Sequence, residues 1–291
     1  MRWRFLVVLT AFLFSPGPLL VSQQKPLPEF DALYKAVREN LARAQRSVHV
    51  YAFKERRTEL HTNPFGKLGT GGTRLSDVYP SATPRLTYRR VIQRNGMPVS
   101  ASDLMAQDNA YRERVAEMQR RPRTAVPTPQ QRGERMINDV VDTLQFTLEG
   151  RAVRDGIQTV VIRFTPNADA RPTTREGRMA QKFAGTVWID EAQAEVMRVE
   201  AKTVDELSFG YGMVARLGEG TTALMIRRPI DTDIWMPTEI RLNGRGRAAL
   251  GIRRLVIDFV VEWFDYRRLP VDLPAPFLDP RVHRQAGSGP Q

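Results

Sequence analysis

The chain has 291 residues, no cysteine and a formal net charge of +12. The lack of cysteine excludes disulfides, thiol catalysis, thiolate metal sites and a lipid-modified N-terminal cysteine. A chain of this length can bury one large or two small cores. Its basic charge attracts polyanions, unless the arginines are simply spread over solvated faces.

The N-terminus has the three regions of a secretory signal peptide. Arg2 and Arg4 give a basic start, residues 5–14 are apolar, and a Pro-Gly-Pro sequence at 16–18 ends the run. A membrane-spanning helix needs about 20 apolar residues, so we expect cleavage near Ser22 rather than an uncleaved anchor. The mature protein is then expected to be periplasmic or secreted, with no transmembrane segment.

The next segments predict one helix and two strands. Apolar residues at spacings of three and four predict an amphipathic helix over 29–46. Residues 47–60 and 85–96 predict extended segments. Between them lies the glycine-rich stretch 65–73. It lacks the Gly-Lys-Ser/Thr order of a phosphate loop and opens no helix, so we expect an inter-strand loop.

Helices continue as far as residue 143. A capping box that starts at Ser100 predicts a helix over 101–119. A proline-bearing linker follows at 120–131. A short helix comes next, with its apolar positions at Met136, Ile137, Val140 and Val141.

From Leu144 onward, alternation of apolar and polar residues predicts strands. Asp155-Gly156 is a strong hairpin signal, a loop is expected over 166–182, and a tight turn over 190–193 joins two further strands. More strands are expected at 207–217, 221–228, 236–248 and 251–267.

The fold class is therefore α+β, mainly β. We expect a curled antiparallel meander of about eight to ten strands, forming a half-open barrel, because twisted sheets curl as strands accumulate. Helices from the N-terminal half should cap it. The expected domains are a signal peptide (1–22), one half-barrel domain (23–268) and an extended or disordered tail (269–291).

No sequence motif indicates catalysis, a cofactor or a metal site. His49, His61 and His283 share no metal-ligand spacing, and Asp231 and Asp233 form at most a solvated pair in a turn. Glu262 and Asp265 are expected on opposite faces of the last strand. We therefore expect a protein that is not an enzyme.

Large apolar side chains are the remaining candidates for function. Curled sheets with apolar interiors bind acyl chains, although these side chains also suit an ordinary core. The predicted ligand-binding residues of the concave face are Phe146, Ile162, Phe164, Trp188, Tyr211, Trp235, Phe259 and Trp263.

Several segments resemble a group of uncharacterised exported bacterial proteins. They include YRRVIQRNGMPVS (88–100), FTLEGRAVRDG (146–156), IRFTP (162–166) and the VWID hairpin (187–190) with its following RVEA. This hairpin is also similar to the LolA/LolB-like superfamily of outer-membrane lipoprotein-sorting proteins, and to stress regulators of the RseB/MucB type. The resemblance implies a half-barrel capped by helices that binds acyl chains or lipoproteins.

The leading hypothesis is a periplasmic, non-enzymatic protein that binds lipid, an acyl chain or a lipoprotein. Basic residues at its rim would hold an anionic head group, and we expect a monomer that does not bind nucleic acid. The first alternative is a regulatory module of the RseB/MucB type, which docks an envelope protein without a small-molecule ligand. The second is a hydrolase with an unrecognised site.

Overall fold

The computed structural model describes residues 26–62, 70–81, 86–120, 129–209, 215–248 and 253–269. The following sequence predictions lie outside these ranges: the signal peptide, residues 65–69 of the glycine-rich stretch, most of the linker at 120–131, Tyr211, His283 and the tail beyond 269.

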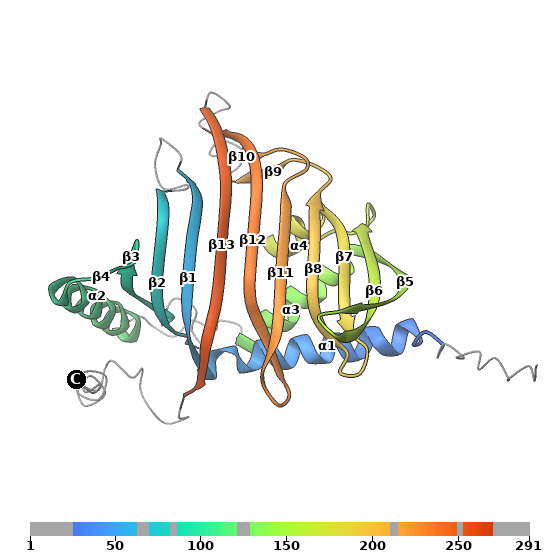
Figure 1. The fold of residues 1–291 in the computed structure, drawn as a ribbon, viewed down its shortest axis with the longest axis horizontal. Helices are drawn as coiled ribbons and strands as arrows, with labels where there is room; N and C mark the ends of the chain where they lie inside the picture. Colours follow the sequence, from blue (N-terminus) through green and yellow to red (C-terminus); the bar gives the residue numbers. More distant parts are fainter. Residues whose placement is uncertain are drawn as a thin grey trace, which may run out of the picture.

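The strands form one open antiparallel sheet. Its order is β4-β3-β2-β1-β13-β12-β11-β8-β7-β6-β5, and β10 pairs with both β12 and β9 (Figure 1). The bounds are β1 (Tyr51–Thr62), β2 (Thr70–Tyr79), β3 (Tyr88–Arg94), β4 (Met97–Pro98), β5 (Leu144–Arg154), β6 (Ile157–Pro166), β7 (Phe183–Asp190), β8 (Glu195–Thr203), β9 (Leu207–Phe209), β10 (Ala215–Leu217), β11 (Thr222–Asp231), β12 (Ile234–Ala248) and β13 (Arg253–Arg268).

The predicted fold class is confirmed. Of the 13 strands in the described ranges, β4, β9 and β10 are only two or three residues long, and the other ten match the upper end of the expected number. The strand expected at 207–217 is divided into β9 and β10. Residues 70–73, expected in a loop, belong to β2, where Gly71 and Gly72 adopt φ of 76° and 80°.

Four helices complete the described structure, and three of them come from the N-terminal half as expected. They are α1 (Phe30–Ser47), α2 (Ala101–Arg120), α3 (Pro129–Asp142) and α4 (Arg175–Ala180). α4 lies within the segment expected to be a loop. Thr174 caps its N-terminus, because its side chain accepts a hydrogen bond from Gly177 N. Among the described residues, no helix has both the length and the apolar character needed to cross a bilayer.

α1 and α3 pack together on one face of the sheet. α1 contacts β8 and β12, and α3 contacts β5 and α4 (Figure 1). We call this the inner face and the opposite one the outer face. Directly paired residues of neighbouring antiparallel strands share a face. The inner face therefore includes the register-paired residues Val187, Val199, Met225, Ile240 and Val261.

Local signals explain the hairpins beneath the helices. Asp155 and Gly156 join β5 to β6 with φ of 52° and 77°, as the turn type with two positive φ values requires. Asp190 shapes the next hairpin, because its Oδ1 accepts hydrogen bonds from Ala192 N at 2.8 Å and Gln193 N at 3.0 Å. Both predicted turns are confirmed.

α2 is attached separately, at the edge of the sheet. Ser100 Oγ accepts from Asp103 N at 3.1 Å, which confirms the predicted cap. The rings of Tyr88 and Tyr111 stack with centroids 4.4 Å apart. Arg90 donates two hydrogen bonds to Asp108, at 2.9 and 3.0 Å, so an ion pair fixes the same contact.

Candidate functional site

An apolar cavity of about 320 Å³ lies between the inner face and the helices. The sheet contributes residues from β5 to β8 and Met225 from β11, and α4 contributes Ala180. Almost all of its surface is carbon. The sheet wall consists of Leu144, Phe146, Ile162, Phe164, Phe183, Val187, Ile189, Val196, Val199 and Met225.

The helices supply the opposite wall. Phe30, Tyr34, Val37 and Leu41 recur at three- and four-residue spacing, so they form one stripe of α1 that faces the sheet. Val140 and Val141 of α3 also line the cavity. Leu33 of α1 packs in a buried cluster with four sheet residues, Val160, Ile162, Ile189 and Val196.

Arg38 is the one charged residue among the described residues that line this cavity. Its guanidinium donates a hydrogen bond to Asn138 Oδ1 of α3. The guanidinium carbon also lies 5.4 Å from the centre of the Tyr34 ring. Arg38 therefore connects the two helices and sets a positive charge beside an apolar space.

Three of the predicted site residues, Phe146, Ile162 and Phe164, line the cavity together. Trp188 lies on the outer face, because Val187 and Ile189 on either side of it point into the cavity. The guanidinium carbon of Arg154 is 4.1 Å from the centre of its ring.

The other predicted residues lie elsewhere. Phe259 is on the inner face but on β13, where the guanidinium carbon of Arg57 is 4.2 Å from its ring centre. Trp263 donates its Nε1–H to Glu55 Oε2 at 3.0 Å. Trp235 is 2% exposed and donates to Gln193 Oε1 at 2.8 Å. Tyr211 is outside the described residues.

Sequence reasoning missed the helical wall of the cavity. The apolar stripes of 29–46 and of the helix near Met136 predict helices that cap the sheet, but not the wall of a binding site. The sequence signal that could have revealed this wall is the length of the apolar stripe. Phe30, Tyr34, Val37 and Leu41 extend over three turns of α1, and an amphipathic helix of that length must cover an apolar sheet surface.

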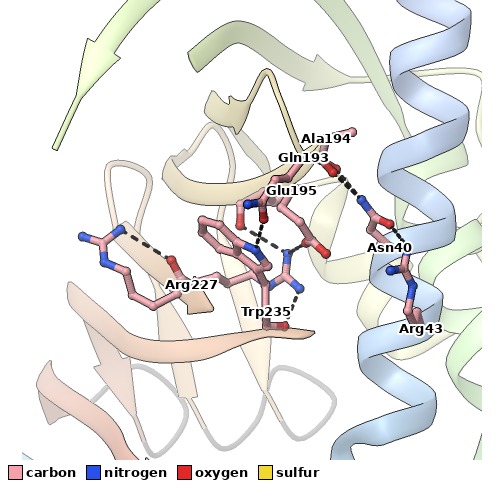
Figure 2. Close-up of polar contacts among 9 residues, drawn as sticks. Asn40, Arg43, Gln193, Ala194, Glu195, Arg227 and Trp235 are labelled. Carbon is pink, nitrogen blue, oxygen red and sulfur yellow. Dashed lines mark hydrogen bonds and ion pairs between the residues drawn. The ribbon is translucent and has the colours of Figure 1, made fainter. Parts of the chain in front are cut away.

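A polar network fixes the C-terminal half of α1 to two hairpins (Figure 2). Asn40 Nδ2 donates to Gln193 O at 2.8 Å and to Ala194 O at 3.0 Å. Arg43 donates to Asn40 Oδ1, which holds the amide in this orientation. One end of the cavity's helical cover is therefore anchored by hydrogen bonds to the β7–β8 turn.

A buried ion pair continues the network to β11 and β12. Arg227 Nη1 donates to Glu195 Oε2 at 2.9 Å, and Arg227 Nη2 donates to Trp235 O at 2.7 Å. Burial raises the pKa of Glu195 and lowers that of Arg227, while the attraction between the two charges opposes both shifts. Arg227 Nη1 also donates to Val196 O at 3.2 Å, so the pair is tied to the backbone of two strands and is a structural element of the fold.

Asp231, one of the residues considered for metal binding, has other partners. Asp231 Oδ2 accepts from the Tyr51 hydroxyl at 3.0 Å, and its Oδ1 accepts from Thr232 N at 2.8 Å. These two hydrogen bonds lower the pKa of Asp231. Within the described part of the chain, no group of three acidic or histidine side chains is placed to hold a metal ion.

No family model matches the chain, and no curated protein matches it. Solved structures with a similar chain course include a DUF1329 family protein from Desulfovibrio piger, with 13% identity, a TM-score of 0.29 and coverage of 85% of this chain and 98% of that one. A LolA superfamily protein from Nitrosomonas europaea has 12% identity, a TM-score of 0.31 and coverage of 82% and 94%.

A putative outer membrane lipoprotein-sorting protein domain from Vibrio parahaemolyticus has 9% identity, a TM-score of 0.33 and coverage of 86% and 98%. Because all three TM-scores are below 0.5, the function proposed below rests on the geometry of the cavity.

Proposed function

We propose that the protein is a non-enzymatic carrier or receptor that binds an acyl chain in the cavity between α1, α3 and the inner face. The observation that supports this is the composition of the walls: a half-open space of about 320 Å³ whose surface is almost entirely carbon. Its volume is at the lower end of the range for ligand pockets, roughly 300 to 1,000 Å³.

Hydrophobic transfer is the only strong interaction that such walls offer. Each methylene moved from water into them contributes roughly 0.8 kcal/mol. A polar ligand would lose its hydration there without gaining hydrogen bonds, which is costly. The cavity therefore selects for a hydrocarbon chain over a sugar, a peptide backbone or a nucleotide.

Arg38 gives the ligand an orientation. An acyl chain in the cavity would have its carboxylate or phosphate end beside this guanidinium, which suits both groups because it can donate two parallel hydrogen bonds. We therefore include an anionic head group in the proposed ligand. The expected signal peptide would deliver the protein to the periplasm or beyond, where acyl chains of lipids and lipoproteins are its partners.

The test is binding of a fluorescent fatty acid, followed by competition with unlabelled fatty acids of increasing length. We expect affinity to rise with each methylene until the cavity is full and then to level off. Ala180→Trp places a large ring in the cavity and should abolish binding. Ala110→Trp, on the exposed surface of α2, is the matched control.

Two results would contradict the proposal. One is equal binding by the Ala180→Trp and Ala110→Trp variants, with both folded by circular dichroism. The other is no fatty-acid binding by the unaltered protein, together with specific retention of an envelope protein, which would favour the regulatory alternative.

A further inference from the structure

Three arginines lie directly opposite one another on neighbouring strands. Arg216 of β10 pairs with Arg247 of β12, and Arg247 pairs with Arg254 of β13. All three side chains are exposed. Directly opposite residues have Cβ atoms only about 4.5–5.5 Å apart. The row therefore places three positive charges side by side.

The row lies on the outer face. The neighbouring register row, Leu217, Gly246 and Leu255, belongs to the inner side, where Leu217 and Leu255 are buried against Phe183, a residue that also lines the apolar cavity. Side chains alternate between faces along a strand. Arg247 and its two partners therefore point away from the cavity.

Two further arginines extend the row along β12. Arg241 and Arg245 alternate in step with Arg247, so they occupy the same outer face and are likewise exposed. We call Arg216, Arg241, Arg245, Arg247 and Arg254 the outer arginine cluster. Successive members on β12 are about 7 or 14 Å apart along the strand.

Two acidic side chains form ion pairs with the cluster, and Asp258 lies on the same face, opposite Asn243. Glu206 approaches Arg216 at 3.6 Å, and Glu239 pairs with Arg241. Among the described residues, Arg245, Arg247 and Arg254 have no acidic partner. Like charges directly opposite each other destabilise a sheet, so the isolated protein carries a repulsion that a bound anion would relieve.

The surface beside the cluster is concave and amphipathic. Arg241 borders an open hollow of about 560 Å³ that spans the outer side of β7, β8, β11, β12 and β13. Its charged lining residues besides Arg241 are Arg198, Glu200, Lys202 and Asp258. They lie beside the apolar Leu224 and Val260, and beside Leu60, which is 62% exposed. Charged and apolar groups therefore alternate over one exposed sheet surface.

We propose that the outer arginine cluster docks the protein on a membrane surface rich in anionic phospholipid. Guanidinium groups bind phosphate through paired hydrogen bonds, and basic side chains near a charged bilayer attract it additively. The exposed leucine favours a lipid surface over a soluble polyanion, because a phosphate polymer offers it no apolar contact. This site goes beyond the acyl-chain cavity and lies on the opposite face of the sheet.

The test is co-sedimentation of the exported form of the protein with vesicles. One set consists of phosphatidylcholine alone, and the other contains about 30% phosphatidylglycerol. The key variant is the triple substitution Arg245→Gln, Arg247→Gln and Arg254→Gln. The control triple is Arg112→Gln, Arg114→Gln and Arg120→Gln, which removes the same net charge from exposed positions of α2.

We expect binding only to the vesicles with phosphatidylglycerol, and weaker binding as salt is raised, because ions screen the attraction. The cluster triple should lower the partition coefficient by about a hundredfold, because each arginine is expected to contribute about fivefold. The control triple should change it far less. Fatty-acid binding in the cavity should be unaltered in both, so failure of one proposal is distinguishable from failure of the other.

Three outcomes would overturn the docking proposal. The first is equal loss of binding in the two triples, which would mean that net charge alone matters. The second is equal binding to both kinds of vesicle. The third is tight binding of soluble polyphosphate without binding to vesicles, which would make the cluster a site for a free polyanion.

Discussion

Arg227 and Glu195 form an ion pair at 2.9 Å with side chains only 4% and 5% exposed. The pair joins β11 to the start of β8, and Arg227 also donates to the Trp235 carbonyl. A charge that loses its partner in such a place has neither water nor a counter-ion.

Glu195→Gln should therefore destabilise the protein strongly. It leaves Arg227 buried with a neutral partner, and breaking a buried pair costs about 3–5 kcal/mol. Urea unfolding measures the loss. The control is Asp155→Asn, which breaks the exposed pair with Arg228 and should cost less than about 1 kcal/mol. Similar losses for the two variants would show that the buried pair has no special role.

Asn40→Asp should loosen α1 from the β7–β8 turn. The aspartate cannot donate to the Gln193 and Ala194 carbonyls, so two hydrogen bonds are lost at a cost of about 1–3 kcal/mol. Hydrogen–deuterium exchange should become faster in α1. Asn109→Asp on α2 is the matched control, since it keeps an acceptor for Arg112. Unchanged exchange in α1 would contradict the anchoring role.

Asp139 should make stability depend on pH in the acid range. Burial alone would raise the pKa of this carboxyl, but hydrogen bonds from the backbone and side chains of Thr173 and Thr174 lower it to about 2. Because the folded pKa is lowered, the stabilisation is complete above the ordinary value of 3.8 and is lost as the pH falls toward 2.

Asp139→Asn tests this directly. At neutral pH we expect a loss of about 1–2 kcal/mol, kept small by the solvent exposure of the group. Thermal unfolding between pH 2 and pH 7 should show that the difference from the unaltered protein shrinks below pH 3.8. Asp142→Asn, on the exposed end of the same helix, is the control. A difference that stays constant with pH would refute the assignment.

Arg247→Thr should stabilise the protein rather than destabilise it. The substitution removes the central charge of the arginine row, and each relieved like-charge contact is worth roughly 0.2–1 kcal/mol. The gain should shrink in high salt. Arg163→Thr, on the outer face but paired with Glu149, should bring no gain. The measurement is the melting temperature of each variant at low and high salt. A loss of stability in Arg247→Thr would argue against repulsion in the row.

The local elements of this fold could be predicted from the sequence. α1, the Asp155-Gly156 hairpin and the cap at Ser100 depend on residues close together in the chain. The pairing of β1 with β13 depends on contacts between distant residues, and no local pattern specifies it. The same limit applies to the helical wall of the cavity.

Trp188 shows why the site could be predicted only in part. The segment 183–190 is apolar at most positions, so alternation does not reveal which residues face inward. For Phe146, Ile162 and Phe164, alternation with polar residues predicts which side chains share a face. Trp188 lies between the apolar residues Val187 and Ile189. Its large ring favours a cavity residue, whereas its side chain lies on the outer face of the sheet.

The ladder between β1 and β13 joins residues 51–59 to residues 259–268. Its formation closes a loop that contains nearly the whole folded chain, and such distant contacts make folding slow. During synthesis β1 cannot pair until β13 has been made, so the sheet cannot be completed before translation has passed residue 268. We therefore expect the nascent chain to lack its central ladder until residue 268 has left the ribosome.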